Sequence, residues 1–135
     1  MVAAVILNEN GHILLQLRDQ KKEIRSPGKW SLPGGFRKPT ESSLQAVKRE
    51  IYEETNLELT RPFFFATLID VFEDLPYISI DFYFDRIKTP YALEVNEGQE
   101  LRFYDLSDFV SLNTSRHIDL ICLYANQLFK SMKSD

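Results

Sequence analysis

The periodicity of the apolar residues changes along the chain, and this change most limits the folds open to it. Short apolar runs cover 2–7 and 12–18, and they flank Asn10-Gly11, a dipeptide that readily adopts positive φ and is typical of a β-hairpin. From Thr40 to Thr55 the apolar residues instead recur at three- and four-residue steps, which predicts a helix. We therefore expect a mixed α+β sandwich.

The second half of the chain predicts further strands and a closing helix. Runs rich in β-branched and aromatic residues cover 57–72 and 78–87, separated by a turn at 73–76, and another strand is expected over 100–106. The last segment has helical spacing, so a C-terminal helix should cover one face of the sheet. Its apolar residues are Ile118, Ile121, Cys122, Ala125, Leu128, Phe129 and Met132.

Glycine, proline and asparagine mark the boundaries between these elements. Residues 19–29 are polar and fit a loop, and a short strand over 30–32 should be broken by Pro33-Gly34-Gly35. Asn56 follows the predicted helix and can close it, because asparagine tolerates the left-handed conformation at a helix C-terminus. The apolar stripe of this helix is expected at Leu44, Val47 and Ile51.

Composition limits the protein class. With 135 residues, of which 44% are hydrophobic and 27% charged, the chain is expected to form a single domain over 1–135. It has one cysteine and no apolar stretch long enough to span a bilayer, so we expect a cytoplasmic protein without membrane contact. A net charge of -4 argues against nucleic-acid binding. The segment 18–38 nevertheless carries seven basic and two acidic residues, so it is either a site for a small anion or a solvated loop.

Three glutamates on the predicted helix point to metal chemistry. Glu50, Glu53 and Glu54 stand at i, i+3 and i+4, which places their carboxylates on one face. Like charges at these spacings destabilise a helix, and the C-terminal end of the helix dipole disfavours them further. A divalent cation such as Mg²⁺, which prefers oxygen ligands, would compensate. The alternative is a solvated acidic surface.

The residues around these glutamates resemble the Nudix box. From Gly35 the chain continues with five residues, Glu41, seven residues, Arg49-Glu50, an aliphatic residue, one residue, Glu53-Glu54, one residue, and Asn56-Leu57. The family pattern G-x5-E-x7-R-E-U-x-E-E-x-G-U is met everywhere except at the last glycine, which is Asn56 here. The lead-in GKWSLPGG is also similar to that family. The resemblance implies a Nudix-type α/β/α sandwich with a mixed sheet, a box helix and a C-terminal helix.

The resemblance also implies roles for individual residues. Mg²⁺ or Mn²⁺ would be held by Glu50, Glu53 and Glu54 with the Gly35 carbonyl, and the water would be activated by Glu53 or Glu97. Glu100 is the fallback for Glu97. A structural ion pair is expected between Glu41 and Arg49.

Substrate contacts are less closely fixed by the motif. Arg18 and Arg25 are suited to binding phosphate oxygens. Asn113 lies just before the last predicted helix, where the MutT-type branch carries a base-reading asparagine after a longer connecting segment, although Asn113 or Ser115 could instead cap that helix. Trp30 and the aromatic residues of the strands are either a base-stacking surface or, more often at such spacing, part of the core.

The implied activity is metal-dependent hydrolysis of a nucleoside diphosphate linked to another group. Because the first strand begins at residue 2, without the N-terminal extension of some relatives, we expect the compact MutT-type branch. Its members convert a nucleoside triphosphate, oxidised or not, to the monophosphate and pyrophosphate. ADP-ribose, a sugar nucleotide or a dinucleoside polyphosphate is the alternative substrate, and a noncatalytic nucleotide-binding regulatory module is a further alternative. The partner is a small nucleotide, and the protein is a monomer or homodimer.

Overall fold

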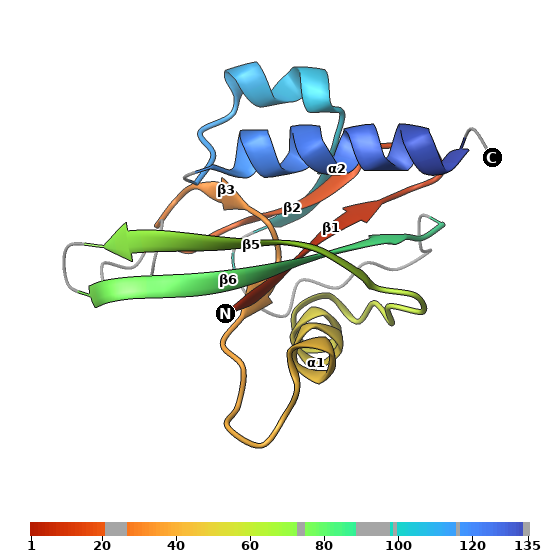
Figure 1. Cartoon of the computed structure of the whole chain (residues 1–135). Helices are drawn as coiled ribbons and strands as arrows, with labels where there is room; N and C mark the ends of the chain where they lie inside the picture. Colours follow the sequence, from red (N-terminus) through yellow and green to blue (C-terminus); the bar gives the residue numbers. More distant parts are fainter. Residues whose placement is uncertain (21–26, 73–74, 89–97, 99, 116, 134–135) are drawn as a thin grey trace.

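A computed structural model of the protein describes residues 1–20, 27–72, 75–88, 98, 100–115 and 117–133. The strands come in two groups, each followed by a helix, in the order that the sequence predicts, and the two helices cover opposite faces of one sheet (Figure 1). The elements are β1 (Val2–Leu7), β2 (Ile13–Leu17), β3 (Trp30–Ser31), β4 (Gly34–Gly35), α1 (Ser43–Thr55), β5 (Phe63–Phe72), β6 (Leu75–Arg86), β7 (Glu100–Tyr104), the short 3-10 helix η1 (Leu106–Ser111) and α2 (Ile118–Lys133).

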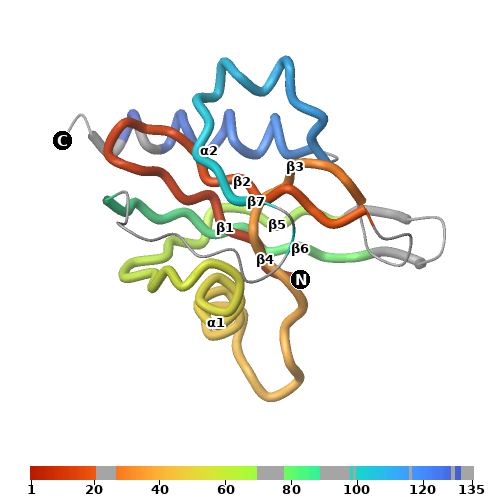
Figure 2. The backbone as a smooth tube through the Cα atoms, turned by 180° about the vertical axis from the view of Figure 1, so that it is seen from behind, coloured from red at the N-terminus to blue at the C-terminus, as the bar shows by residue number. Residues whose placement is uncertain are grey.

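The sheet is mixed, as expected. Its main path runs β3-β2-β1-β6-β5, with β4 paired to β1 and β7 paired to β2. Strands β1 and β6 are parallel, and the other pairs are antiparallel. The view from behind shows α1 on one face and α2 on the other, with η1 beside α2 (Figure 2). The α/β/α expectation is therefore confirmed.

Strand β1 runs through the middle of the molecule, and every residue of it is buried. Because successive side chains of a strand point to opposite faces, its residues divide between two apolar clusters. Val5 and Leu7 pack in the cluster that includes Ile118, Cys122 and Ala125 of α2. Ala4 and Ile6 pack in the cluster that includes Ala46, Val47 and Ile51 of α1. Burial raises the pKa of the Cys122 thiol, as expected for a core cysteine.

The box helix begins three residues later than its apolar pattern indicates. Ser42 is its N-cap, and Ser42 and Gln45 form a capping box in which each side chain accepts from the other residue's backbone amide. Asn56 ends the helix with φ 63° and ψ 13°, which confirms the predicted left-handed cap. Leu44 is exposed, so the buried stripe runs through Ala46, Val47 and Ile51 instead.

Two further boundaries differ from the sequence-based expectation. The strand predicted over 57–72 begins only at Phe63, and β6 begins at Leu75 within the predicted turn. The strand predicted over 30–32 ends at Ser31, before the proline and glycines as expected, and Gly34-Gly35 form the separate short strand β4. None of the described helices is long and apolar enough to cross a membrane.

Candidate active site

The strand β4 lies between β1 and the box helix. Gly35 pairs with Val2 and Gly34 pairs with Ala3, and the carbonyl of Pro33 accepts from the Ala4 amide at 3.1 Å. A Cβ on Gly34 would overlap the Val2 carbonyl and lie 2.7 Å from the Ala3 Cα. Only glycine therefore permits this close pairing, which the sequence pattern did not reveal.

Two glutamates of α1, one helical turn apart, face the two glycines. Glu54 is 2% exposed, and its Oε2 accepts a hydrogen bond from the Gly34 amide at 3.2 Å. A Cβ on Gly35 would lie 2.5 Å from the Glu50 carboxylate. Glycine at both positions thus leaves room for these carboxylates. Glu54 is therefore not part of a solvated acidic surface. The Glu53 side chain, by contrast, is half-exposed.

Arg49 connects the acidic residues of the box. Its Nε and NH2 donate to both oxygens of Glu41, with the shortest contact at 2.6 Å. Its NH1 donates to Glu50 at 2.9 Å and to Glu53 at 3.1 Å. NH2 also donates to the Phe36 carbonyl, which fixes the chain just after Gly35. The structure thus contains the Glu41–Arg49 ion pair at the positions that the resemblance implies.

Each member of this ion pair strongly shifts the pKa of the other. Hydrogen bonds from Arg49 and from the Lys38 amide lower the pKa of Glu41 to about 2. The same carboxylate, with a further contribution from Glu50, raises the pKa of Arg49 well above its ordinary value. Both groups therefore stay charged throughout the neutral range.

The donor chemistry of this site suits a hard divalent cation. Carboxylate oxygens on one helix face and a glycine without a side chain are the kind of ligands and space that Mg²⁺ or Mn²⁺ uses. Within the described part of the chain, no three acidic, histidine or cysteine side chains are grouped closely enough to hold a metal ion. Arg49 NH1 instead bridges Glu50 and Glu53, so a cation there would have to displace this single nitrogen.

Arg18 and Asn113 are brought to opposite sides of one short segment. The Arg18 amide donates to the Lys29 carbonyl at 3.0 Å, and the Trp30 amide donates to the Asn113 carbonyl at 2.8 Å. Both contacts are main-chain hydrogen bonds, so they place the backbone of the two candidate substrate residues beside the start of β3. A few residues after Trp30 the chain reaches Gly34, whose amide contacts Glu54 of the box helix.

The helix-cap alternative for Asn113 and Ser115 is wrong. Helix α2 begins at Ile118, five residues after Asn113, and the Ser115 hydroxyl donates to Ser31 at 2.9 Å. The Asn113 side chain is exposed.

Other sequence candidates have different outcomes. Arg25 and Glu97 lie outside the described residues. Glu100 is on β7 and forms an ion pair with Arg102.

The aromatic residues of the strands fall into two groups. Phe82 and Phe84 are buried in the core, whereas Phe63 and Phe64 are half-exposed. Sequence reasoning missed the roles of Gly34 and of the Phe36 carbonyl, because a backbone group has no residue-type signature.

A mixed sheet between helical layers, with a box helix packed against a glycine pair, defines a Nudix-type domain. The family comparison agrees with this geometry. The model of the NUDIX domain family matches residues 1–124, so the chain belongs to that family.

Relatives and solved structures extend this result. The chain is 40% identical over 73 residues to the 8-oxo-dGDP phosphatase NUDT18 of Mus musculus and 40% identical over 57 residues to that of Homo sapiens. These matches cover 54% and 42% of this chain but 20% and 17% of the relatives, so the chain spans about a fifth of their length.

The fold is similar to that of solved NUDIX and MutT proteins. The NUDIX domain of Shewanella oneidensis NrtR, in complex with ADP ribose, superposes with a TM-score of 0.80 at 20% identity over 95% of this chain and 86% of that chain. The MutT protein of Methanosarcina mazei Go1 superposes with a TM-score of 0.73 at 25% identity over 96% and 92% of the two chains.

Proposed function

We propose that this chain hydrolyses the bond between the α- and β-phosphoryl groups of an oxidised guanine nucleotide. The structural observation that carries the proposal is the buried Glu54 carboxylate, which faces the Gly34 amide beside Glu50. The Gly34 amide satisfies one Glu54 oxygen, and the buried carboxylate lies one helical turn from Glu50 on the same face, an arrangement that suits a cation site better than a solvated surface. The name of the 40% identical relatives, 8-oxo-dGDP phosphatase, supports the substrate class.

The proposal covers a diphosphate and a triphosphate substrate. The sequence resemblance favours the triphosphate, whereas the name of the relatives specifies 8-oxo-dGDP. Hydrolysis of the same α–β bond consumes one water and releases the nucleoside monophosphate in both cases. The other product is orthophosphate from the diphosphate and pyrophosphate from the triphosphate, so product analysis separates them.

Glu50, Glu53 and Glu54, with the Gly35 carbonyl, are the proposed ligands of Mg²⁺ or Mn²⁺. When bound, the metal would neutralise diphosphate charge and polarise the phosphorus under attack. Arg49 would keep Glu41 through Nε and NH2 and release Glu50 and Glu53 from NH1. The ion pair would thus hold the helix and the preceding loop together while the carboxylates change partner.

The remaining residues are assigned to the water, the phosphates and the base. Glu53 is exposed enough to reach the attacking water and accept its proton, with Glu97 as the second candidate base. Arg18 and Arg25 would bind phosphate oxygens, because a guanidinium pairs with two oxygens at once. Asn113, exposed beside Trp30, would read the base through its amide.

A substrate panel tests the proposal. The protein is assayed with Mg²⁺ or Mn²⁺ against 8-oxo-dGDP, 8-oxo-dGTP, dGTP, ADP-ribose, a sugar nucleotide and a dinucleoside polyphosphate. We expect the highest kcat/KM with an oxidised guanine nucleotide and release of 8-oxo-dGMP. A clear preference for ADP-ribose, which occupies one structurally similar NUDIX domain, would contradict the substrate class. Tight binding without turnover of any compound would favour a noncatalytic regulatory module instead.

We also propose that the protein acts in the cytoplasm, as a monomer or homodimer, on a small nucleotide rather than on nucleic acid. The acidic net charge of -4 supports the last point. Equilibrium sedimentation with and without nucleotide measures the oligomeric state.

A further inference from the structure

A pocket lies at the opposite end of β1 and β6 from the glycine pair. Its volume is about 520 Å³. Its walls come from the residues just after β1, from the segment between α1 and β5 with the start of β5, and from the end of β6 with the two residues that follow it. Along β1, Val2 pairs with Gly35 whereas Leu7 pairs with Arg86, which lines the pocket. Five residues of extended strand separate these points by roughly 16 Å. The pocket is therefore distinct from the candidate active site.

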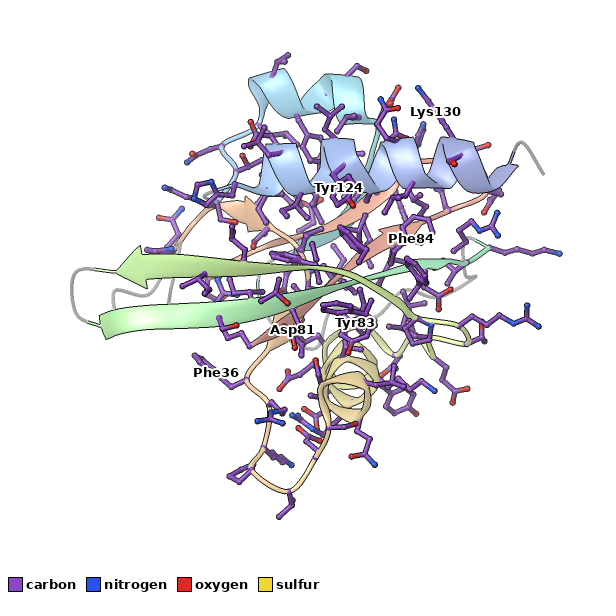
Figure 3. The ribbon with its side chains drawn as sticks, viewed as in Figure 1. Phe36, Asp81, Tyr83, Phe84, Tyr124 and Lys130 are labelled. Atoms are coloured by element: carbon purple, nitrogen blue, oxygen red, sulfur yellow. The ribbon has the colours of Figure 1, made fainter. Side chains whose placement is uncertain are left out.

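Figure 1 shows the course of the backbone segments that contribute the lining residues. The segment that follows α1 curves outward before it enters β5, and it does so beside the end of β6. Figure 3 shows Asp81 and Phe84 at different positions along β6, with Phe84 further from the start of the chain. Phe84 is 2% exposed and belongs to the pocket lining, whereas Asp81 accepts a hydrogen bond from Ser43 of the box helix.

The pocket has a basic rim. Arg61 and Lys88, together with Arg86, line it and are exposed, in a protein whose net charge is -4. Two acids, Glu9 and Asp85, also line it, so the rim carries a small positive excess. An arginine and a lysine at one opening suit a single phosphate group, because both donate charge-assisted hydrogen bonds to its oxygens.

A buried carboxylate fixes the two walls. Asp85 is 5% exposed, and its Oδ2 accepts from the Arg61 amide at 3.1 Å while its Oδ1 accepts from the Arg86 amide at 2.8 Å. The charge of Asp85 is thus directed at the backbone of Arg61 and Arg86. This arrangement holds the main chain at these two residues in place before any ligand arrives, and such preorganisation lowers the cost of binding.

An aromatic surface lies beside the basic rim. Phe63 is 51% exposed and pairs across the sheet with Phe84, which is buried. An exposed phenylalanine at a pocket wall offers a face on which a nucleobase can stack. The pocket thus combines a stacking surface with a phosphate-binding rim at a size typical of small-molecule sites.

We propose that this pocket binds a nucleoside monophosphate, with its phosphate at Arg61 and Lys88 and its base on Phe63. The site is separate from the hydrolytic one and needs no metal. A monophosphate fits better than a longer polyphosphate, because the three basic lining residues are partly offset by Glu9 and Asp85 and leave only a small positive excess.

The test is a titration of the ¹⁵N-labelled protein with AMP, without divalent metal, followed by NMR amide shifts. We expect saturable shifts at Arg61, Phe63 and Lys88. The double substitution Arg61→Gln with Lys88→Gln should weaken AMP binding by about tenfold or more, because both charge-assisted contacts are lost. Lys130→Gln, which removes an exposed lysine of α2, is the matched control and should leave the affinity unchanged.

Further arms separate the two parts of the ligand. Phe63→Ala should weaken AMP binding but leave binding of inorganic phosphate unchanged, whereas the double substitution should weaken both. Both basic side chains are exposed, and an unchanged spectrum outside the pocket verifies that the variant is folded. Shifts confined to Gly34, Gly35 and Glu54, the absence of saturable shifts, or equal AMP affinity in the folded double variant would each overturn the proposal.

Discussion

Arg49 and Glu41 form a two-point ion pair, in which Nε lies 3.0 Å from Oε2 and NH2 lies 2.6 Å from Oε1. This pair joins the middle of the box helix to the loop that precedes it. Arg49 also contacts Glu50 and Glu53, so the geometry of the proposed metal ligands depends on the same side chain.

The first prediction concerns the pH dependence of stability. The pKa of Glu41 is about 2 in the folded protein and 4.5 in an unfolded chain, where Glu41 lacks its partners. Its contribution to stability is therefore complete above about pH 4.5. That contribution should be lost as the pH falls from 4.5 toward 2. Melting temperatures of the wild type and of Glu41→Gln should therefore differ at neutral pH and converge toward pH 2. A constant difference across this range would contradict the assignment.

The second prediction separates charge from geometry at Arg49. Arg49→Lys keeps the charge but cannot contact Glu41 with a planar fork and reach Glu50 and Glu53 at once. We expect a lower melting temperature and a turnover reduced by about tenfold or more, because misplaced ligands cost activity steeply. Arg102→Lys is the control, since its ion pair with Glu100 is exposed and contributes little to stability. Equal effects of the two substitutions would rule out a special role for Arg49.

The two glycines should respond differently to alanine. At Gly34 the added Cβ meets the backbone of Val2 and Ala3, so Gly34→Ala should lower the free energy of unfolding by about 2 kcal/mol or more. At Gly35 it meets only the end of the flexible Glu50 side chain, so Gly35→Ala should cost less than about 1 kcal/mol but reduce turnover by about tenfold or more. Chemical denaturation and steady-state kinetics measure both. The reverse pattern would contradict the proposed site.

The fourth prediction concerns Asn56, the one departure from the box pattern. With φ at 63°, Asn56→Gly should be neutral or slightly stabilising, whereas Asn56→Ala should lower the free energy of unfolding by about 1 kcal/mol. Urea denaturation of the two variants tests this difference directly. If alanine were tolerated better than glycine, the left-handed cap would not be what selects the residue here.

The sequence predicted the elements that local patterns encode. The β-hairpin at Gly11, the box helix and its end at Asn56 follow from turn chemistry and periodicity, and each is present. The apolar pattern predicts a helix start at Thr40, whereas a capping box at Ser42 and Gln45, which is also readable in the sequence, sets the start at Ser43.

The rest depends on contacts between distant segments. Helical spacing places Glu50, Glu53 and Glu54 on one face, but only packing against β4 buries Glu54 and leaves Glu53 half-exposed. In the same way, the position of Asn113 before the last helix is compatible with a helix cap, and only the packing of its segment beside Trp30 places it elsewhere. Neither the type of a residue nor its spacing from others indicates which strand will lie beside that residue in the fold.

The most direct test of the account is the release of 8-oxo-dGMP from 8-oxo-dGDP and 8-oxo-dGTP by the wild type and by Glu54→Gln. Glutamine keeps the hydrogen-bond acceptor for the Gly34 amide, so the fold and melting temperature should be retained. Glu58→Gln, an exposed glutamate just beyond the helix, is the matched control. We predict metal-dependent turnover by the wild type and by Glu58→Gln and a loss of about 100-fold or more in Glu54→Gln, because a negative charge is removed where transition-state charge is stabilised. Near-normal turnover by a folded Glu54→Gln variant would contradict the account.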